Sequence, residues 1–174
     1  MKLLLFTCLC CLATAFPNGA PDIACKEMIP GHLPTETSGE NPFMLKISAT
    51  SYKPGDEISG ELYSADNMTF KGFLIEVGTA QVVSEKEESV GEFINLDNTV
   101  QKHVCEKGGI THINNGEKRL VKFTWKAPST SAGDLSFRAT VVQQFFPSKY
   151  WLGAFSERVK AAKAERAFSD RILS

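Results

Sequence analysis

From residue 43 to residue 146, apolar residues recur at every second position in short runs that Gly, Pro, Asn and Asp separate. This period of two is typical of β-strands with one buried face, because successive side chains of a strand point to opposite sides. Seven or more such runs, with no amphipathic helix between them, predict an all-β antiparallel sandwich. The clearest predicted strands cover 43–49, 58–62, 70–78, 118–125 and 135–142, and shorter candidates cover 81–84 and 91–96.

Details of the pattern indicate how some strands are surrounded. In 70–78 alternate residues are predicted to face the core, and Leu74 on the other face implies partial cover there too. The Asn-Asn-Gly at 114–116 is predicted to form a hairpin turn, because these residues tolerate positive φ. The predicted inward residues of the two later strands are Val121, Phe123, Trp125, Leu135, Phe137, Ala139 and Val141.

The two ends of the chain depart from this pattern. Residues 1–15 combine a positive residue, an apolar run and the small residues Ala13 and Ala15, which is the layout of a secretory signal peptide. We therefore predict export from the cell, and no later stretch is apolar enough for a transmembrane anchor. One domain is predicted at 16–155, followed by a helix-prone or flexible tail at 156–174. Packing of the tail on the domain, disorder and a membrane-seeking helix all remain open.

Cleavage would leave two of the five cysteines, Cys25 and Cys105. In the oxidising secretory route such a remaining pair is predicted to form a disulfide. The alternative comes from the string HVCEKGGITH, in which His103 and His112 flank the second cysteine and, with His32, could supply zinc ligands. A bonded cysteine has no thiolate to give, and no HExxH or carboxylate pattern completes a set, so no metal site is predicted.

Motifs for catalysis are missing from the sequence. It contains no GxSxG nucleophile elbow, no phosphate-binding GxxxxGK[ST] and no dinucleotide fingerprint. We therefore predict that the protein is not an enzyme and needs no cofactor. The acidic run SEKEES at 84–89 mixes charges and lacks a turn glycine, which disfavours a calcium site. Removing Lys2 leaves 18 of the 19 basic residues against 20 acidic ones, and this balance argues against bulk binding to nucleic acid.

The candidate binding surface is a row of lysines. Lys118, Lys122 and Lys126 recur at every fourth residue and would share the face opposite the predicted core, about 13 Å apart. Arg138 on the next strand could extend this patch. Spaced ammonium and guanidinium groups suit the phosphate or sulfate groups of lipopolysaccharide, teichoic acid or glycosaminoglycan. The alternative is a solvated edge whose lysines discourage strand-to-strand aggregation.

Two other surface features invite interpretation. Asn67-Met68-Thr69 is the one N-glycosylation sequon of the sequence, and its polar surroundings predict a glycan at Asn67. Aromatic residues crowd the junction between the last strand and the tail, where they would form either a lid on the sandwich or an exposed ledge for partner contact. These residues are Phe145, Phe146, Tyr150, Trp151 and Phe155.

Several ordered motifs between about residues 19 and 151 resemble the reeler domain: GAPDIACKEMIPGH, YKPGDEISGEL, FKGFLIEV, ITHINNGEKRLVKFTWKAP and GDLSFRATVV followed by YW. The whole chain is similar to small secreted insect defence proteins that consist of a signal peptide and one reeler domain. The resemblance implies an immunoglobulin-like β-sandwich with a binding role, and Cys25 and Cys105 match the family's cysteine positions. It supplies no motif for binding residues, and the tail beyond 156 departs from it.

This resemblance also implies a role in innate immunity. The expected partners are microbial envelope glycoconjugates such as lipopolysaccharide, teichoic acid or glucan, with haemocyte aggregation or antimicrobial action in the haemolymph as the outcome. The alternative is an extracellular structural or adhesive protein whose partners are host matrix or haemolymph proteins. A carrier of small apolar ligands inside the sandwich is disfavoured, because the large inward Phe and Trp residues would fill that space.

Overall fold

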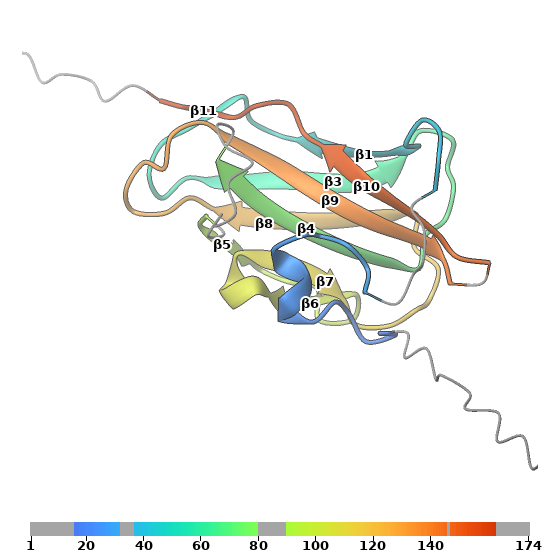
Figure 1. Cartoon of the computed structure of the whole chain (residues 1–174). Coiled ribbons are helices and arrows are strands. Elements are labelled where there is room, and N and C mark those ends of the chain that lie inside the picture. Colours follow the sequence, from blue (N-terminus) through green and yellow to red (C-terminus); the bar gives the residue numbers. More distant parts are fainter. Residues whose placement is uncertain (1–15, 32–36, 80–89, 146, 163–174) are drawn as a thin grey trace, which may run out of the picture.

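The computed structural model describes residues 16–31, 37–79, 90–145 and 147–162, and in them two antiparallel β-sheets pack against each other (Figure 1). The first sheet has the strand order β1 (Phe43–Ile47), β3 (Glu57–Ser64), β8 (Leu120–Lys126), β5 (Glu92–Ile94). The second has the order β10 (Lys149–Phe155), β9 (Leu135–Gln144), β4 (Gly72–Thr79), β7 (Gly109–His112), β6 (Gln101–Val104). The remaining elements are a parallel pair, β2 (Ser51–Tyr52) with β11 (Lys160–Ala161), and two short 3-10 turns, η1 (Asp22–Cys25) and η2 (Cys105–Lys107). This architecture confirms the predicted all-β, immunoglobulin-like sandwich.

Aromatic side chains from both sheets fill the space between them. Trp125 of β8 meets Phe137 of β9 edge to face, with ring centroids 5.6 Å apart, and Phe123 stacks on Phe137 at 5.9 Å. Burying a side chain of this size contributes roughly 1.5–3 kcal/mol. All seven residues predicted to face inward on β8 and β9 are buried, as the period of two requires. The interior is therefore occupied by the protein's own rings.

The predicted hairpin at 114–116 is wrong. β7 and β8 belong to different sheets, so this segment crosses from one sheet to the other. None of its three residues has a positive φ. The turn is held instead by the Asn114 side chain, whose Oδ1 accepts a hydrogen bond from the Gly116 N–H at 3.0 Å. Asparagine is common in turns for two reasons: it tolerates a left-handed backbone, and its side chain can accept a hydrogen bond from the backbone two residues on. Asn114 uses the second.

The first part of the predicted tail is extended and not helical. Val159 is buried, and its N–H and C=O groups bond to those of Leu135, both at 2.8 Å. Ala161 then pairs with Tyr52 in the parallel β11–β2 pair. Val159 and Ala161 alternate with charged residues, a period of two that the Ala and Lys content of the segment obscured. The packed part of the chain thus continues to at least Ala162, beyond the domain end at 155 that was predicted from the sequence.

Other sequence predictions fall outside the described residues. These are the signal peptide at 1–15, the strand at 81–84, the acidic run at 84–89, and the tail from 163 onward, together with His32 and Phe146. Within the described part of the chain, no helical segment has the length and apolar character needed to cross a membrane.

Candidate functional site

Residues 16–31, here called the N-terminal strap, cross the outer face of the five-stranded sheet (Figure 1). Below them, seven consecutive residues of β4 are buried, so this strand is covered on both faces. Leu74 is only 4 % exposed and packs in one cluster with Met28 of the strap and Val104 of β6. The predicted cover over Leu74 is confirmed, and the strap provides it.

A disulfide fastens the strap to the sheet. Cys25 of η1 and Cys105 of η2 are bonded with an S–S distance of 2.04 Å, which confirms the predicted pair. The Cys105 N–H also donates to a carboxylate oxygen of Asp22 at 2.8 Å. Cys105, Glu106 and Lys107 have φ angles of 56°, 52° and 77°. Such left-handed backbone costs roughly 1–2 kcal/mol per residue, so the links to η1 hold a turn that would otherwise be unfavourable.

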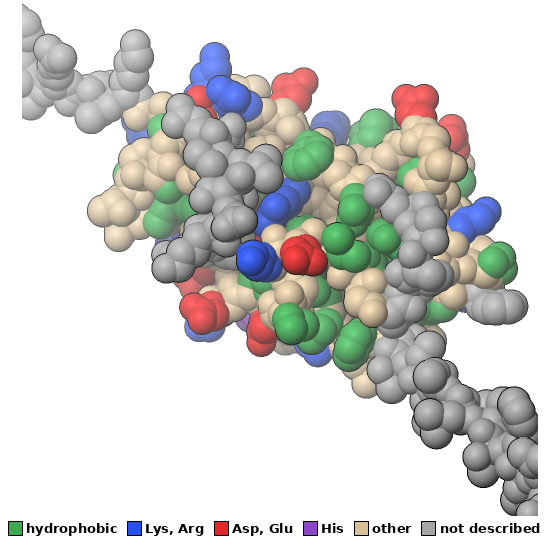
Figure 2. Space-filling view, viewed as in Figure 1, with side chains coloured by type: hydrophobic (Ala, Val, Ile, Leu, Met, Phe, Trp, Pro, Cys, Tyr) green, Lys and Arg blue, Asp and Glu red, His purple; other side chains and the backbone are tan. Residues whose placement is uncertain are grey.

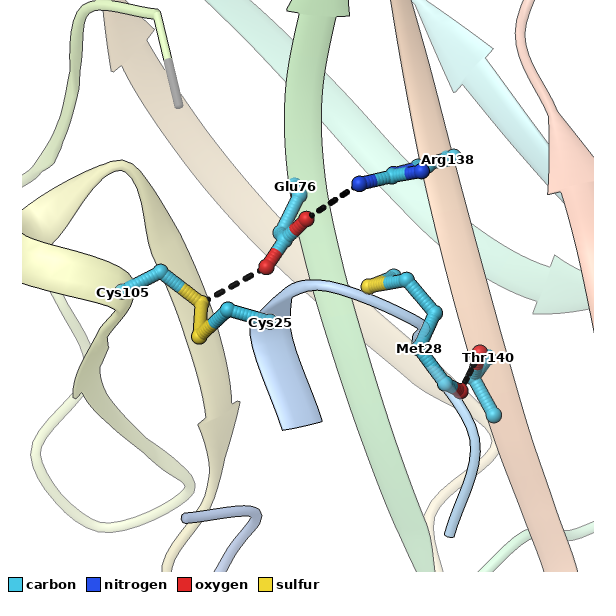
Figure 3. A network of polar contacts seen from close by, with 6 residues as sticks. All are labelled: Cys25, Met28, Glu76, Cys105, Arg138 and Thr140. Carbon is cyan, nitrogen blue, oxygen red and sulfur yellow. Dashed lines mark hydrogen bonds and ion pairs between the residues drawn. A yellow bond between two sulfur atoms is a disulfide. The ribbon is translucent and has the colours of Figure 1, made fainter. Parts of the chain in front are cut away.

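A buried carboxylate lies beside the disulfide (Figure 3). Glu76 of β4 is 3 % exposed, and its Oε2 accepts a hydrogen bond from Nη2 of Arg138 at 2.9 Å. The guanidinium offsets part of the cost of removing the carboxylate from water. The other oxygen, Oε1, lies 2.7 Å from Sγ of Cys105. Because a disulfide sulfur carries no hydrogen, this is a close contact in the oxidised protein and not a hydrogen bond.

Sequence reasoning missed Glu76. The available signal was a lone carboxylate in the apolar string FLIEV, on the same side of the strand as Leu74. A buried, paired carboxylate at that position indicates that something covers the second face of the strand.

Hydrogen bonds join the strap to the sheet at two further points. The Thr140 hydroxyl donates to the Met28 carbonyl at 2.6 Å, and the Ala20 N–H donates to Thr111 Oγ1 at 2.9 Å. The Thr111 hydroxyl in turn donates to the Phe73 carbonyl at 2.7 Å. These bonds satisfy polar groups that the strap removes from water.

His112 of β7 is a third connection between sheet and strap. The Phe73 N–H donates to Nδ1 at 3.1 Å, which places the ring hydrogen on Nε2, 3.3 Å from the Phe16 carbonyl. Burial is the main cause that lowers the pKa of His112, so the ring is neutral at physiological pH. Two glycines make room for it: a Cβ at Gly72 would lie 2.8 Å from the ring, and one at Gly19, where φ is +103°, would lie 2.3 Å from the His112 carbonyl oxygen.

The histidines and cysteines do not share a metal-binding geometry in the described residues. His103 lies exposed on β6, where partial burial and the nearby Lys107 lower its pKa. One group of potential ligands is close enough for a metal ion within the described chain: Cys25, Glu76 and Cys105. Its two sulfurs are bonded to each other, so neither is available as a thiolate for a metal or as a catalytic nucleophile.

An open apolar cleft, here called the strap cleft, lies between the strap and the sheet. Its volume is about 430 Å³, including space open to solvent. Figure 2 shows hydrophobic side chains gathered on this face of the molecule, around the strap. Phe16 and Ile29 both line the cleft and expose 39 % and 43 % of their surface. Other lining residues are Ala24, Met28, Leu74, Val142 and Phe145, and the polar side chains among the lining are His112 and Thr140.

The structure does not bring the predicted lysine patch together, because Lys118 is buried. Its ammonium group donates to the carbonyl oxygens of Lys71, Asn114 and Gly116 at 3.0, 2.8 and 2.8 Å. Burial lowers the pKa of Lys118. The regular alternation of β8 begins only at Leu120, so extending it back to residue 118 gave the wrong face.

Lys122 and Lys126 do point outward from β8, but carboxylates surround them. Lys122 is 3.6 Å from Glu61 Oε1. Lys126 lies opposite Glu57 on β3 and Glu92 on β5 in the strand register. Arg138 belongs to the other sheet and is paired with Glu76. The proposed four-residue cationic patch therefore does not exist as one surface, because alternation on one strand does not reveal the charges on its neighbours.

The other predicted surface residues are separate from one another. Asn67 lies exposed in the turn between β3 and β4, a position that leaves room for a glycan, and its carbonyl accepts a hydrogen bond from Arg119. The aromatic group divides: Phe145 lines the strap cleft, Trp151 packs against the core, and Phe155 is exposed. Tyr150 is buried in β10, so the described aromatic residues form no single ledge.

The chain is similar in sequence to two kinds of known protein. Ferric-chelate reductase 1 from Mus musculus is 33 % identical over 156 residues, but the match covers 87 % of this chain and only 25 % of that protein. This chain thus spans about a quarter of the reductase. "Putative defense protein 2" from Antheraea mylitta is 29 % identical, with 86 % of this chain and 92 % of that protein covered.

A solved structure and a family model identify the same domain. The crystal structure of the human F-spondin reeler domain superposes with a TM-score of 0.62 at 18 % identity, covering 74 % of this chain and 94 % of that one. This likeness shows the fold. The family model for the reeler domain matches residues 23–167. Because that match covers most of the chain, the protein belongs to the reeler domain family.

Proposed function

We propose that this protein is a secreted defence protein that binds components of microbial envelopes. The observation that carries the proposal is the length of the match to insect defence proteins. The similarity to the Antheraea mylitta protein extends over 92 % of its length, and the Bombyx mori "Putative defense protein" is covered over 87 %. The aligned region accounts for most of the length of those proteins, and the reeler domain model covers residues 23–167 of this chain.

The strap cleft supports a binding role. It is an apolar surface open to solvent on a domain whose interior is already filled by its own side chains. Exposed apolar surface of this kind is typical of sites that bind a ligand or a partner. The reductase activity in the name of the mouse relative does not extend to this proposal, since this chain corresponds to a quarter of that protein.

A second candidate, an adhesive extracellular protein with host partners, is favoured by the open face of the four-stranded sheet. Met44, Tyr63 and Leu120 lie side by side in the strand register there. Met44 and Leu120 are 38 % and 45 % exposed. An apolar row of this kind among charged neighbours suits contact with another protein.

The experiment that tests the proposal is retention of the secreted, oxidised protein on immobilised lipopolysaccharide, lipoteichoic acid, β-glucan and washed haemocytes, at low and at physiological salt. Retention on microbial material at physiological salt is the expected result. Retention on haemocytes alone would move the assignment to the adhesive candidate. Transcript levels after bacterial challenge separate the two further, because a defence protein responds to infection and a matrix protein follows development.

The glycan at Asn67 belongs to the same proposal. Asn67 lies on a turn remote from the strap in sequence, and its exposed side chain is accessible for modification in the secretory route. A mass decrease on enzymatic deglycosylation, lost in Asn67→Gln, tests it.

A further inference from the structure

We propose that the strap cleft binds the end of one acyl chain of an anionic envelope glycolipid of the lipid A type, with a headgroup phosphate directed toward Lys102. This inference rests on the proposed function and names the ligand class of that function. The binding surface is then the strap cleft on the five-stranded sheet, and not the lysines of β8 on the four-stranded sheet.

The lining of the cleft selects hydrocarbon over sugar. Its two polar side chains already have partners in the protein: Thr140 donates to the Met28 carbonyl, and His112 bonds to Phe73 and Phe16. No lysine, arginine or carboxylate lies among the lining residues in the described chain. A sugar would leave its hydroxyl groups without partners there, which costs free energy, whereas a methylene chain needs none.

The walls of the cleft are held in place before any ligand arrives. The disulfide fixes η1, and the bond from Thr140 fixes the strap again at Met28. Ligand binding therefore orders little of the protein, which favours affinity. At the rim, Phe16 and Ile29 expose apolar surface that a bound chain would remove from water, at roughly 25 cal/mol per Å².

Lys102 supplies a positive charge beside the cleft. In the strand register Lys102 lies opposite Thr111, which lies opposite Leu74, so its side chain is on the same face as the cleft, two strands or roughly 10 Å away. It lies against the strap, because a Cβ at Gly19 would be 2.8 Å from Lys102 Cε. Lys102 is exposed and forms no ion pair with any described residue.

Two carboxylates on this face, Glu76 and Asp22, already accept hydrogen bonds from the protein, and Glu27 of the strap is exposed. Glu76 accepts from Arg138, and Asp22 accepts from the Cys105 N–H. An apolar cleft with an ammonium group nearby that forms no ion pair with a described residue is complementary to an acyl chain that carries a phosphate headgroup.

The test uses the oxidised protein and displacement of the fluorescent probe dansyl-undecanoic acid by purified lipid A. Ala24→Trp fills the cleft from η1, and Ile23→Trp is its matched control, because Ile23 is 86 % exposed and does not line the cleft. We expect Ala24→Trp to weaken probe and lipid A binding by about tenfold or more, and Ile23→Trp to stay within about twofold. Ile29→Asp at the exposed rim is a second variant that tests the same site if Ala24→Trp does not fold.

Lys102→Ser tests the phosphate contact separately from the acyl-chain contact. We expect it to weaken lipid A binding by about two- to fivefold, as loss of one exposed charge contact does, and to leave displacement by uncharged dodecanol unchanged. Equal binding of lipid A by folded Ala24→Trp, Ile29→Asp and the wild-type protein would overturn the assignment. If Ala24→Trp loses the probe but is still retained on whole microbes, the cleft is not the recognition surface and the proposed function stands. Failure of the wild-type protein to bind any microbial material, with probe binding intact, would overturn the proposed function and with it the glycolipid.

Discussion

The outer faces of the two sheets have different surroundings, although both are built from alternating strands. On the four-stranded sheet, β3 alternates exposed and buried residues, and its outward charges pair with those of β8. On the five-stranded sheet, β4 is buried throughout its first seven residues because the strap covers it. The open face pairs its charges with one another beside the apolar row of Met44, Tyr63 and Leu120. The covered face carries the disulfide, the buried carboxylate and the cleft.

This difference indicates where recognition can arise. A face whose charges neutralise one another offers little excess attraction to an anionic ligand. A face covered by a strap gains apolar walls where the cover is incomplete. Four sets of substitutions test this contrast between the two faces.

Removing the disulfide should have the largest effect on the covered face. Cys25→Ser with Cys105→Ser opens a link between residues separated by 80 positions, and the chain-entropy model gives a loss of about 4–5 kcal/mol. Urea denaturation of the double variant and of the reduced wild-type protein measures it. Probe binding in the cleft should fall in both. A stability within about 1 kcal/mol of the oxidised protein would mean that the strap is held mainly by its hydrogen bonds.

Lys118→Met should be the next largest change. It removes a buried ammonium group that donates to three carbonyl oxygens, so we expect a loss of about 2–3 kcal/mol. Lys122→Met is the matched control, because Lys122 is exposed and its pair with Glu61 is worth less than about 1 kcal/mol. Equal unfolding midpoints for the two variants would contradict the structural role of Lys118.

The pH dependence of stability should depend on His112. Its folded pKa lies below the usual value near 6.5, so the unfolded chain binds the proton more tightly. Stability is therefore complete above about pH 6.5 and decreases as the pH falls through the folded pKa. We expect thermal unfolding midpoints to drop between about pH 7.5 and 5.5, and to drop less in His112→Gln. His103→Gln is the control and should keep most of the slope, since His103 is largely exposed.

The smallest effect is expected on the open face. Lys122→Ser with Lys126→Ser should change stability by less than about 0.5 kcal/mol, because nearby carboxylates already balance both lysines. Retention on lipopolysaccharide should be unchanged at physiological salt. A clear loss of retention would return the binding surface to β8, as the sequence alone suggested.

The sandwich was predictable from the sequence because the signal for strands is local. Val121, Phe123 and Trp125 show the period of two without knowledge of any partner strand. The disulfide followed from cysteine number and the predicted compartment, and the family resemblance supported it.

The site was less predictable because its contacts join distant segments that have no periodic pattern. Nothing near residues 16–31 indicates that they cover β4, apart from Leu74 and Glu76 on the face that was expected to be only partly covered. The Lys118 side chain points inward and donates to carbonyl oxygens of Lys71 and Asn114. The alternation of side chains along a strand cannot predict such contacts. The carboxylates opposite Lys126 come from β3 and β5, and the sequence does not show that these strands lie beside β8.

The positions of the described ends have a practical consequence for attaching this domain to other molecules. Phe16 lines the strap cleft, whereas β11 lies at the opposite end of the molecule from the first described residues (Figure 1). Directly after β11, the Ala162 N–H donates to the Tyr52 carbonyl at 2.8 Å. A tag or neighbouring domain attached beyond β11 would begin away from the cleft, and one attached directly before Phe16 would begin at its entrance. Attachment beyond β11 therefore leaves the strap cleft open to solution, whereas attachment directly before Phe16 places the added group at the cleft.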